Sequence, residues 1–505
     1  METRNRFSAI NRRTFTITSL ASIAALKVGK SVRSQEATPM PDEGSPEAGM
    51  GMEVLATGLR DPRSIIVDGT DIYFTETGTG GDQELILPAG EGTPEPTAPV
   101  SMHGKTGRLS KYSTTDGSLT EIVSDFHSYT FGEHGEIVGA AGLALDGAGI
   151  AYVAVGSPGP FVGIMPRTGD EGVVFRVDLA TGEKEIIADL LAWEIEHNPD
   201  PAAIDSNLYG MTLLDGVLYV CDAGGNSIIS VDAESGEVAT FAVTGGLDAP
   251  FLPETGNPAR GGDMTIDSVP GSIVVGPDGR LYVSFVSGAP FVPGIVPVEA
   301  FSPDSTQENY AQGLTMVVAL AFDSVGRLYA CTISADFLNQ APGRIVRIEE
   351  DGSLTVVVDN LPVPNGLAFD ADDNLYTTIF SAVSPDGGSL VRIAGVADIP
   401  AAGPQDATPI GDSAGGEATV VTLVNGEIQP AELTLAGNTD VTITVTNEGT
   451  FSHNFTIEGT DFATAMLDPG QSEELTVNLE AGEYVTFCAV PGHREAGMMG
   501  TLTVS

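Results

Sequence analysis

The sequence is poor in positive charge, and this excludes several classes of partner. Of its 505 residues, 22 are Lys or Arg and 69 are Asp or Glu, so the formal net charge is −47. A field of this sign repels the phosphates of nucleic acids and anionic membrane surfaces. We therefore predict no nucleic-acid binding, and we expect a protein partner that docks through charge to present a basic surface.

Long hydrophobic runs are also lacking. A short apolar run, "TFTITSLASIAAL", follows the paired arginines Arg12 and Arg13 and is too short to span a bilayer comfortably. It resembles a twin-arginine export signal, so residues 1–35 are predicted to be a signal and 36–51 a disordered Pro/Glu/Ser linker. We expect a periplasmic, cell-surface or extracellular protein with no transmembrane anchor after processing.

Cysteine is scarce, with three residues in the whole chain. Cys221 in "LYVCDAGG" and Cys331 in "LYACTISAD" follow the same Leu-Tyr-x step, so they occupy the same register of two repeats. Those repeats are not neighbours, so a disulfide between them is not expected. Both are interpreted as small buried apolar residues, which leaves Cys488 as the chemically significant one.

One short unit recurs along most of the chain. It consists of an apolar strand, a turn with Asp or Gly, and a Leu-Tyr-apolar strand, as in "GMTLLDGVLYVCDAGG" and "VALAFDSVGRLYACTI". Six copies, most of them followed by a third strand, predict a six-bladed β-propeller over residues 52–398. The segment "EVLATGL" has no preceding blade, and we expect it to supply the outer strand of the last blade and close the ring.

Parts of this region resemble a known family. The segments "DSNLYGM", "LYVCDAGGNSIISVD" and "GLRDPRSIIV" look like the ScyD/ScyE family of NHL-like secreted propellers. The resemblance implies the propeller fold over roughly residues 52–398. It implies little about chemistry, because propellers host many functions.

The predicted propeller contains oxygen ligands near strand ends that could face its central channel. These are Glu76, Asp205, Asn207 and Asp222. Asn365 in "VPNGLAFD" resembles the strand that supplies an Asn to calcium in gluconolactonase-like propellers. Oxygen ligands from several blades would suit calcium, but Asp and Asn are also the ordinary turn residues of such repeats.

The last part of the chain has a different pattern. Residues 399–417 read as a Gly/Ala/Pro/Asp linker, and 418–505 alternate cleanly in short strands, which predicts a small β-sandwich. Four residues in it form a metal-ligand pattern: His453, Cys488, His493 and Met498. One thiolate, two imidazoles and a weak axial thioether are the ligands of a type 1 copper centre.

The order His…Cys-x4-His-x4-Met resembles the plastocyanin-like cupredoxins. This resemblance covers residues 418–505 and implies one mononuclear blue copper ion, with the spacing "AGM" selecting Met498 over Met499. It also implies that Asn454 ties the two ligand loops together. Because the residue after the cysteine is Ala489, Asn454 would have to bond a backbone group there.

Other interpretations explain these residues less well than a blue copper site, and redox reaction at Cys488 alone would leave both histidines unexplained. A degenerate sandwich without metal does not explain why all four ligands are present. A binuclear copper site needs two bridging cysteines, and structural zinc rarely recruits methionine.

The predicted architecture is therefore all-β, with a six-bladed β-propeller followed by a Greek-key cupredoxin domain. The predicted function is one-electron transfer by an exported protein, with the propeller docking a redox partner, a polymer or a small molecule. In one alternative the propeller is a calcium-dependent lactonase-like hydrolase or a sugar dehydrogenase, with the copper domain as electron acceptor. In another, the chain is a copper-binding or surface-interaction module without catalysis.

Overall fold

The computed structural model describes residues 51–401 and 419–505, apart from short internal gaps. These gaps are 86–100, 131–136, 158–166, 202–203, 253–255, 258–259, 338–340, 382–385, 425–426, 440, 448–452, 461, 468–470, 491–492 and 495–497. The predicted export signal, the first linker and all but the start of the second lie outside the described residues.

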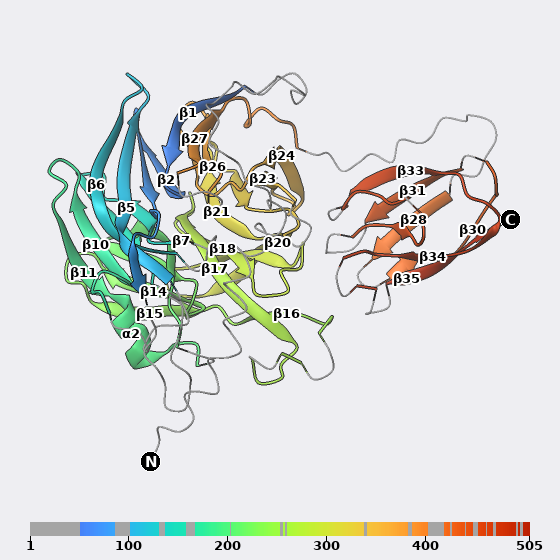
Figure 1. Cartoon of the computed structure of the whole chain (residues 1–505), viewed down its shortest axis with the longest axis horizontal. Coiled ribbons are helices and arrows are strands. Elements are labelled where there is room, and N and C mark those ends of the chain that lie inside the picture. The colour runs from blue at the N-terminus through green and yellow to red at the C-terminus, as the bar shows by residue number, and fades with distance from the viewer. Residues whose placement is uncertain are drawn as a thin grey trace, which may run out of the picture.

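The first part of the chain forms a ring of six antiparallel sheets (Figure 1). The first three blades contain β2 (Pro62–Asp68), β3 (Asp71–Glu76), β4 (Gln83–Leu85), β5 (Ser101–Ser113), β6 (Leu119–Thr130), β7 (Ile137–Val138), β8 (Ala140–Leu145), β9 (Ile150–Val155), β10 (Val173–Asp178), β11 (Lys184–Asp189), β12 (Leu208–Leu214), β13 (Val217–Asp222), β14 (Ser227–Asp232) and β15 (Val238–Val243). The other three contain β16 (Gly246–Asp248), β17 (Thr265–Val275), β18 (Leu281–Ser287), β19 (Val296–Phe301), β20 (Gln307–Leu314), β21 (Val317–Phe322), β22 (Leu328–Thr332), β23 (Gly343–Ile348), β24 (Leu354–Leu361), β25 (Leu367–Phe369), β26 (Leu375–Ile379) and β27 (Gly388–Ile393).

Local sequence explains how each blade folds. In β12 and β13 the register pairs Leu214 with Val217 across Asp215 and Gly216. Both turn residues have positive φ angles of 51° and 82°, which is the conformation of a type I′ hairpin turn and suits an Asp-Gly pair. The alternating apolar residues of the flanking strands then pack between neighbouring blades and form the core.

The ring closes as the sequence predicts. The strand β1 (Met52–Leu59) pairs antiparallel with β27, so the first described segment completes the last blade. The side-chain hydroxyl of Ser381, after β26, also donates to the carbonyl of Pro62 in β2 at 2.9 Å. Both ends of the propeller are thereby joined to each other, and the last blade is completed by the first described strand.

The cysteine prediction is also confirmed. All three cysteines are free and buried. Cys221 and Cys331 belong to different apolar clusters of the propeller, where they pack as small apolar side chains.

Little of the described chain is helical. The helix α2 (Leu190–His197) starts at Asp189, whose carboxylate accepts a hydrogen bond from the N–H of Ala192. No helix among the described residues is long and apolar enough to cross a membrane.

The C-terminal part is a sandwich of two four-stranded sheets. One sheet has the order β29 (Glu427–Gln429), β28 (Thr419–Val424), β31 (Val441–Asn447) and β33 (Ser472–Val477). The other has the order β30 (Glu432–Leu435), β35 (Met499–Val504), β34 (Gly482–Phe487) and β32 (Thr456–Ile457). The pairs β28–β31 and β30–β35 are parallel, so the strands cross over between the sheets instead of forming a simple meander.

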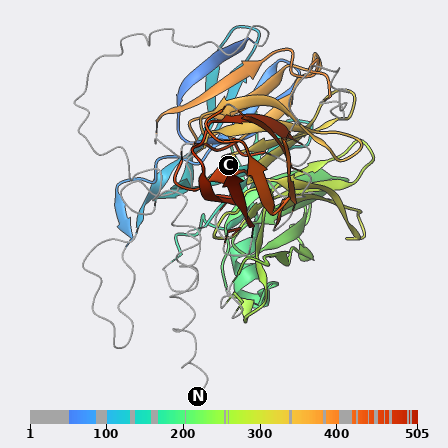
Figure 2. The ribbon, with the colours of Figure 1, turned by 90° about the vertical axis from the view of Figure 1, so that its right-hand side faces the viewer.

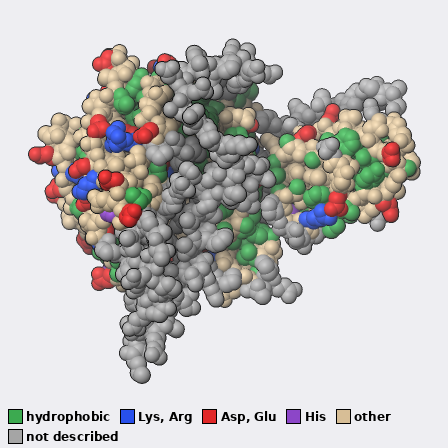
Figure 3. All heavy atoms as spheres, viewed as in Figure 1, with side chains coloured by type: hydrophobic (Ala, Val, Ile, Leu, Met, Phe, Trp, Pro, Cys, Tyr) green, Lys and Arg blue, Asp and Glu red, His purple; other side chains and the backbone are tan. Residues whose placement is uncertain are grey.

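Acidic side chains dot the visible surface of both domains (Figure 3). The few Lys and Arg side chains seen in that view lie beside acidic ones. Exposed pairs such as Arg176–Glu185, at 3.4 Å, account for this pattern. Such pairs add little stability, and they leave the excess of negative charge uncompensated.

Candidate metal centre

The four predicted copper ligands come together at one end of the sandwich. His453 forms a two-way backbone bridge with Leu467 just before β32, and Cys488 follows β34 directly. His493 lies in the loop after Cys488, and Met498 precedes β35. Three ligands therefore come from one loop and the fourth from a separate segment.

The backbone of this loop is fixed by hydrogen bonds between the ligand residues themselves. The N–H of Cys488 donates to the carbonyl of Met498 at 3.1 Å, and the N–H of Met498 donates to the carbonyl of His493 at 2.9 Å. A third bond runs from the N–H of His493 to the carbonyl of Val490 at 3.0 Å. These bonds set the relative positions of the backbone at Cys488, His493 and Met498.

The ligand atoms form a compact triangle. The two Nδ1 atoms of His453 and His493 are 3.1 Å apart, and the Sγ atom of Cys488 lies 3.8 Å from the first and 3.5 Å from the second. Bonds of about 2.1 Å to nitrogen and about 2.3 Å to sulfur span separations of this size when one ion sits between the three atoms. Among the described residues, no other group of three His, Cys, Asp or Glu side chains is this closely gathered.

Burial sets the protonation of these groups. His453, Cys488 and Met498 are fully buried, and His493 is 8% exposed. Burial lowers the pKa of His453 to about 3, with a contribution from the nearby His493, and it lowers the pKa of His493 to about 4. Both imidazoles are therefore neutral near pH 7, which leaves lone pairs available for a metal.

Two asparagines support the ligand segments. The side-chain oxygen of Asn454 accepts a hydrogen bond from the N–H of Ala489 at 2.7 Å, which confirms the predicted tie to a backbone group. The side-chain amide of Asn447 donates to the carbonyl of Leu467, the bridge partner of His453, at 2.7 Å. The sequence predicted the first of these contacts and not the second, because no motif in the sequence pairs Asn447 with Leu467, which lies twenty positions away.

The donor set fits copper better than zinc. The thiolate, the two Nδ1 atoms and a buried thioether at Met498 are the ligand types that select a type 1 copper ion. Met498 is fully buried within the same apolar cluster as Cys488, whereas its neighbour Met499 is 43% exposed. The residues present therefore fit the copper predicted from the sequence.

The candidates in the propeller channel are engaged in holding strands together. Glu76 accepts hydrogen bonds from the N–H of Arg60 at 2.7 Å and from the hydroxyl of Ser110 at 2.5 Å. Asp222 accepts bonds from the N–H of Asn207 at 2.8 Å and from the hydroxyl of Ser206 at 2.8 Å. The contacts of Asp222 link the residues just before β12 to the end of β13, so this carboxylate holds the two strands together.

Asp205 lies in the same segment, before β12. Its N–H lies 3.4 Å from a carboxylate oxygen of Glu194, on α2. Burial, and then the charge of Asp222, raises the pKa of Glu194 to about 8. This corner of the channel therefore brings several carboxyl groups close together and keeps one of them protonated near neutral pH.

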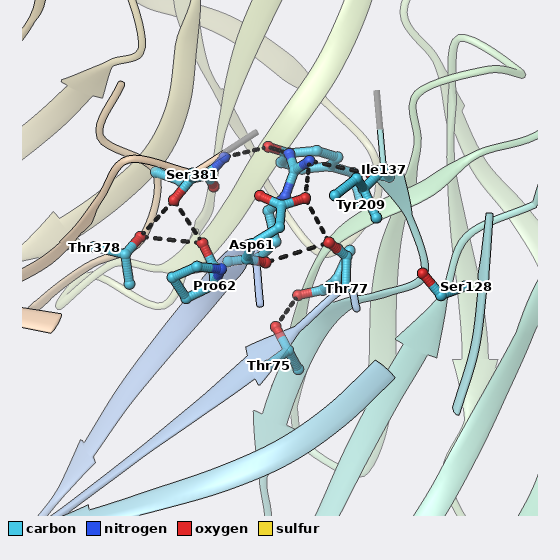
Figure 4. Close-up of polar contacts among 12 residues, drawn as sticks. Asp61, Pro62, Thr75, Thr77, Ser128, Ile137, Tyr209, Thr378 and Ser381 are labelled. Carbon is cyan, nitrogen blue, oxygen red and sulfur yellow. Dashed lines mark hydrogen bonds and ion pairs between the residues drawn. The ribbon is translucent and has the colours of Figure 1, made fainter. Parts of the chain in front are cut away.

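The structure also gathers a polar cluster in the channel that sequence reasoning missed (Figure 4). Arg63 donates to a carboxylate oxygen of Asp61 at 2.9 Å and to the hydroxyl of Tyr209 at 2.6 Å. The side-chain amide of Asn365 donates to the same hydroxyl at 2.8 Å. The sequence signal for this cluster was Arg63 itself, an arginine within a strand, "DPRSIIV", of an otherwise acidic chain.

This cluster gives no support to a calcium ion at Asn365. The guanidinium of Arg63, 4% exposed, places a buried positive charge two hydrogen bonds away from the Asn365 amide. Asp61 offsets this charge, and the Asn365 amide is bonded to Tyr209, so the described contacts of Asn365 are to protein groups. The acidic channel candidates among the described residues do not form a compact ligand group either.

The fold and the ligand cluster define the class of protein: an all-β chain with a six-bladed propeller followed by a cupredoxin domain. Residues 402–504 match the family model of the cupredoxin-like domain. Residues 170–382 match the model of the SMP-30/gluconolactonase/LRE-like region. No curated protein matches the chain.

Solved structures resemble each part separately. Reduced auracyanin from Roseiflexus castenholzii is 27% identical, with a TM-score of 0.17, and the match covers 18% of this chain and 99% of that one. The calcium-binding protein regucalcin from Agrobacterium tumefaciens is 14% identical, with a TM-score of 0.41, and the match covers 68% of this chain and 92% of that one. Membership of the ScyD/ScyE family stays a prediction.

Proposed function

We propose that this chain is an exported blue copper protein that transfers single electrons. The observation that carries the proposal is the triangle of two imidazole Nδ1 atoms and one thiol sulfur, with sides of 3.1 to 3.8 Å. A bound copper ion would supply one-electron chemistry by alternating between its two valences. The chain would supply a rigid set of ligands that suits both.

Each ligand residue has a distinct part in this proposal. Cys488 would give the thiolate and the covalent path to the ion, and His453 and His493 would bind it through Nδ1. Met498 would supply the weaker thioether ligand and tune the potential. Asn454 would hold the loop of Cys488 against the segment of His453 through its bond to Ala489.

The partner follows from the charge. With 69 acidic residues against 22 basic ones, the protein would attract a redox partner with a basic docking surface. Association would slow as salt rises, because ions screen the attraction. The paired arginines Arg12 and Arg13, outside the described residues, support export to the periplasm, the cell surface or the medium.

Copper titration of the metal-free full chain tests this proposal. We expect one copper per chain to survive gel filtration in the wild type and in Met499→Leu, which serves as a control for a general change at the loop. Cys488→Ser should lose most of this copper. Equal retention by Cys488→Ser would refute the assignment of the thiolate.

A second candidate function rests on the match of residues 170–382 to the SMP-30/gluconolactonase/LRE-like region. In it the propeller is a calcium-dependent lactonase-like hydrolase or a sugar dehydrogenase, and the copper domain accepts electrons. Turnover of lactones would favour this candidate. So would sugar oxidation that is coupled to loss of the visible thiolate-to-copper absorption band as the copper is reduced. In a third candidate function, the chain is a copper-binding module without catalysis. A copper-loaded site with very slow electron self-exchange would favour it.

A further inference from the structure

The propeller contributes a residue to the apolar core of the cupredoxin domain. Val292 lies in the loop between β18 and β19 and is 1% exposed. Every other member of its buried apolar cluster is a residue of the C-terminal domain, including Val490 and Met498. Phe251 and Ile295, also from the propeller, pack against the same cluster while remaining partly exposed. The two domains therefore touch through apolar side chains.

The contacting end of the cupredoxin domain is the ligand end. In Figure 1 the C-terminus marks the end of this domain that lies farthest from the propeller. Because β35 runs toward that end and β34 runs antiparallel to it, the loop between them faces the propeller. This is the loop that contains Cys488, His493 and Met498.

The contacted face of the propeller is the one where its channel residues lie. The loop of Val292 joins the second and third strands of its blade, and the loop of Phe251 leads into the first strand. Asp222 ends a second strand and Asn365 precedes a first strand in other blades, so the blade topology places all four at the same face of the ring. Figure 2 agrees, since the C-terminal domain lies in front of the ring in that view.

The connection between the domains is long enough to let them separate. Seventeen residues, 402–418, join the described part of the propeller to β28. A chain of this length spans at most about 60 Å when extended. The contact around Val292 is therefore compatible with this connection but is not required by its length.

We propose that the loop face of the propeller is a docking surface for the ligand end of the cupredoxin domain of the same chain. Docking through Val292, Phe251 and Ile295 buries the ligand end of the cupredoxin domain around Val490, and release of the domain exposes that end to an external redox protein. The proposal rests on the proposed function for its redox consequence, whereas the docking itself requires no metal.

The test compares Val292→Asp with Val325→Asp in the full chain. Val325 is 72% exposed in the turn between β21 and β22, on the opposite face of the ring, so it receives the same charge without touching the interface. Amide hydrogen exchange of 288–295 and 488–493 is measured first on metal-free protein. We expect faster exchange of both segments in Val292→Asp and wild-type exchange in Val325→Asp.

The second readout is the one-electron reduction of ferricytochrome c, a basic haem protein, by the reduced, copper-loaded chain. If the docked state holds about 90% of the molecules, release raises this rate about tenfold. Tris(phenanthroline)cobalt(III), a small oxidant, should show a much smaller gain. If Val292→Asp does not fold, Phe251→Ser is measured in the same way.

The outcomes separate the two proposals. Exchange and cytochrome rates in the interface variant equal to those of Val325→Asp would overturn docking. A wild-type chain without a blue band, but with faster exchange in Val292→Asp, would refute the proposed function and support docking.

Discussion

The side-chain oxygen of Asn454 accepts the backbone N–H of Ala489 at 2.7 Å, which joins the residue after the first ligand to the residue after the second. Other hydrogen bonds join residues of the ligand loop to one another. This one joins the loop to the segment of His453, the ligand that lies outside the loop. This contact and the pairing of Thr456 with Phe487 between β32 and β34 together set the separation of His453 from Cys488.

Replacing this asparagine tests its role as a tie. In Asn454→Ala the N–H of Ala489 loses its partner, which should cost about 1–3 kcal/mol of unfolding free energy. Copper affinity should fall about 10–100-fold, as for other residues that orient metal ligands. Competition with a chelator measures the affinity. Thr456→Val removes only the other hydrogen-bond partner of Asn454 and should keep near-native affinity; equal losses in both variants would argue against the tie.

The two neighbouring methionines form a natural pair for testing the thioether ligand. Met498 is fully buried and Met499 is 43% exposed. Met498→Leu replaces a donor atom with an apolar side chain, which disfavours the more highly charged Cu(II), so the midpoint potential should rise. Met499→Leu should leave it unchanged. Redox titration followed by visible absorbance gives both values, and an identical shift in the two variants would remove Met498 from the ligand set.

The buried pair of Arg63 and Asp61 predicts a large stability effect in the propeller. Arg63→Met leaves the fully buried Asp61 without its cation, which should cost about 3–5 kcal/mol of unfolding free energy. The double variant Asp61→Asn/Arg63→Met should recover part of that loss, since no uncompensated charge remains. Arg176→Met breaks an exposed pair and should cost less than about 1 kcal/mol. Guanidinium unfolding followed by far-UV circular dichroism checks all three.

Glu194 predicts how stability depends on pH. Its pKa is raised to about 8 by burial and by the charge of Asp222, whereas an unfolded glutamate titrates near 4.3. Between about pH 4.5 and 8 the folded state holds a proton that the unfolded chain has lost, so the unfolding free energy falls as pH rises through this window.

Glu194→Gln replaces the titrating carboxyl group with a neutral amide. This variant should raise the melting temperature at pH 8 by several °C, with little gain at pH 5. The exposed Glu196→Gln, on the same helix, is the matched control. Scanning calorimetry at both pH values makes the comparison. A gain in Glu194→Gln that is the same at pH 5 and pH 8 would contradict the raised pKa.

The parts of this structure that sequence could predict are those encoded by local pattern. The six blades follow from a repeated strand-turn-strand unit, and the closing role of β1 follows because "EVLATGL" had no blade of its own. The ligand cluster was predictable because Cys488, His493 and Met498 lie in one short segment.

The unpredicted parts depend on residues far apart in sequence. Arg63 and Tyr209 are separated by 146 positions, and only the curvature of the ring brings them together. Val292 lies in an apolar loop that resembles any other loop between two strands. Its packing against the C-terminal domain depends on shape matching between two domains, which residue patterns do not encode.

The visible spectrum of the oxidised, copper-loaded full chain is the most direct test of the copper assignment. A strong thiolate-to-copper charge-transfer band should appear, vanish on reduction with dithionite and be missing in Cys488→Ser. A colourless protein after copper loading would contradict the blue copper centre.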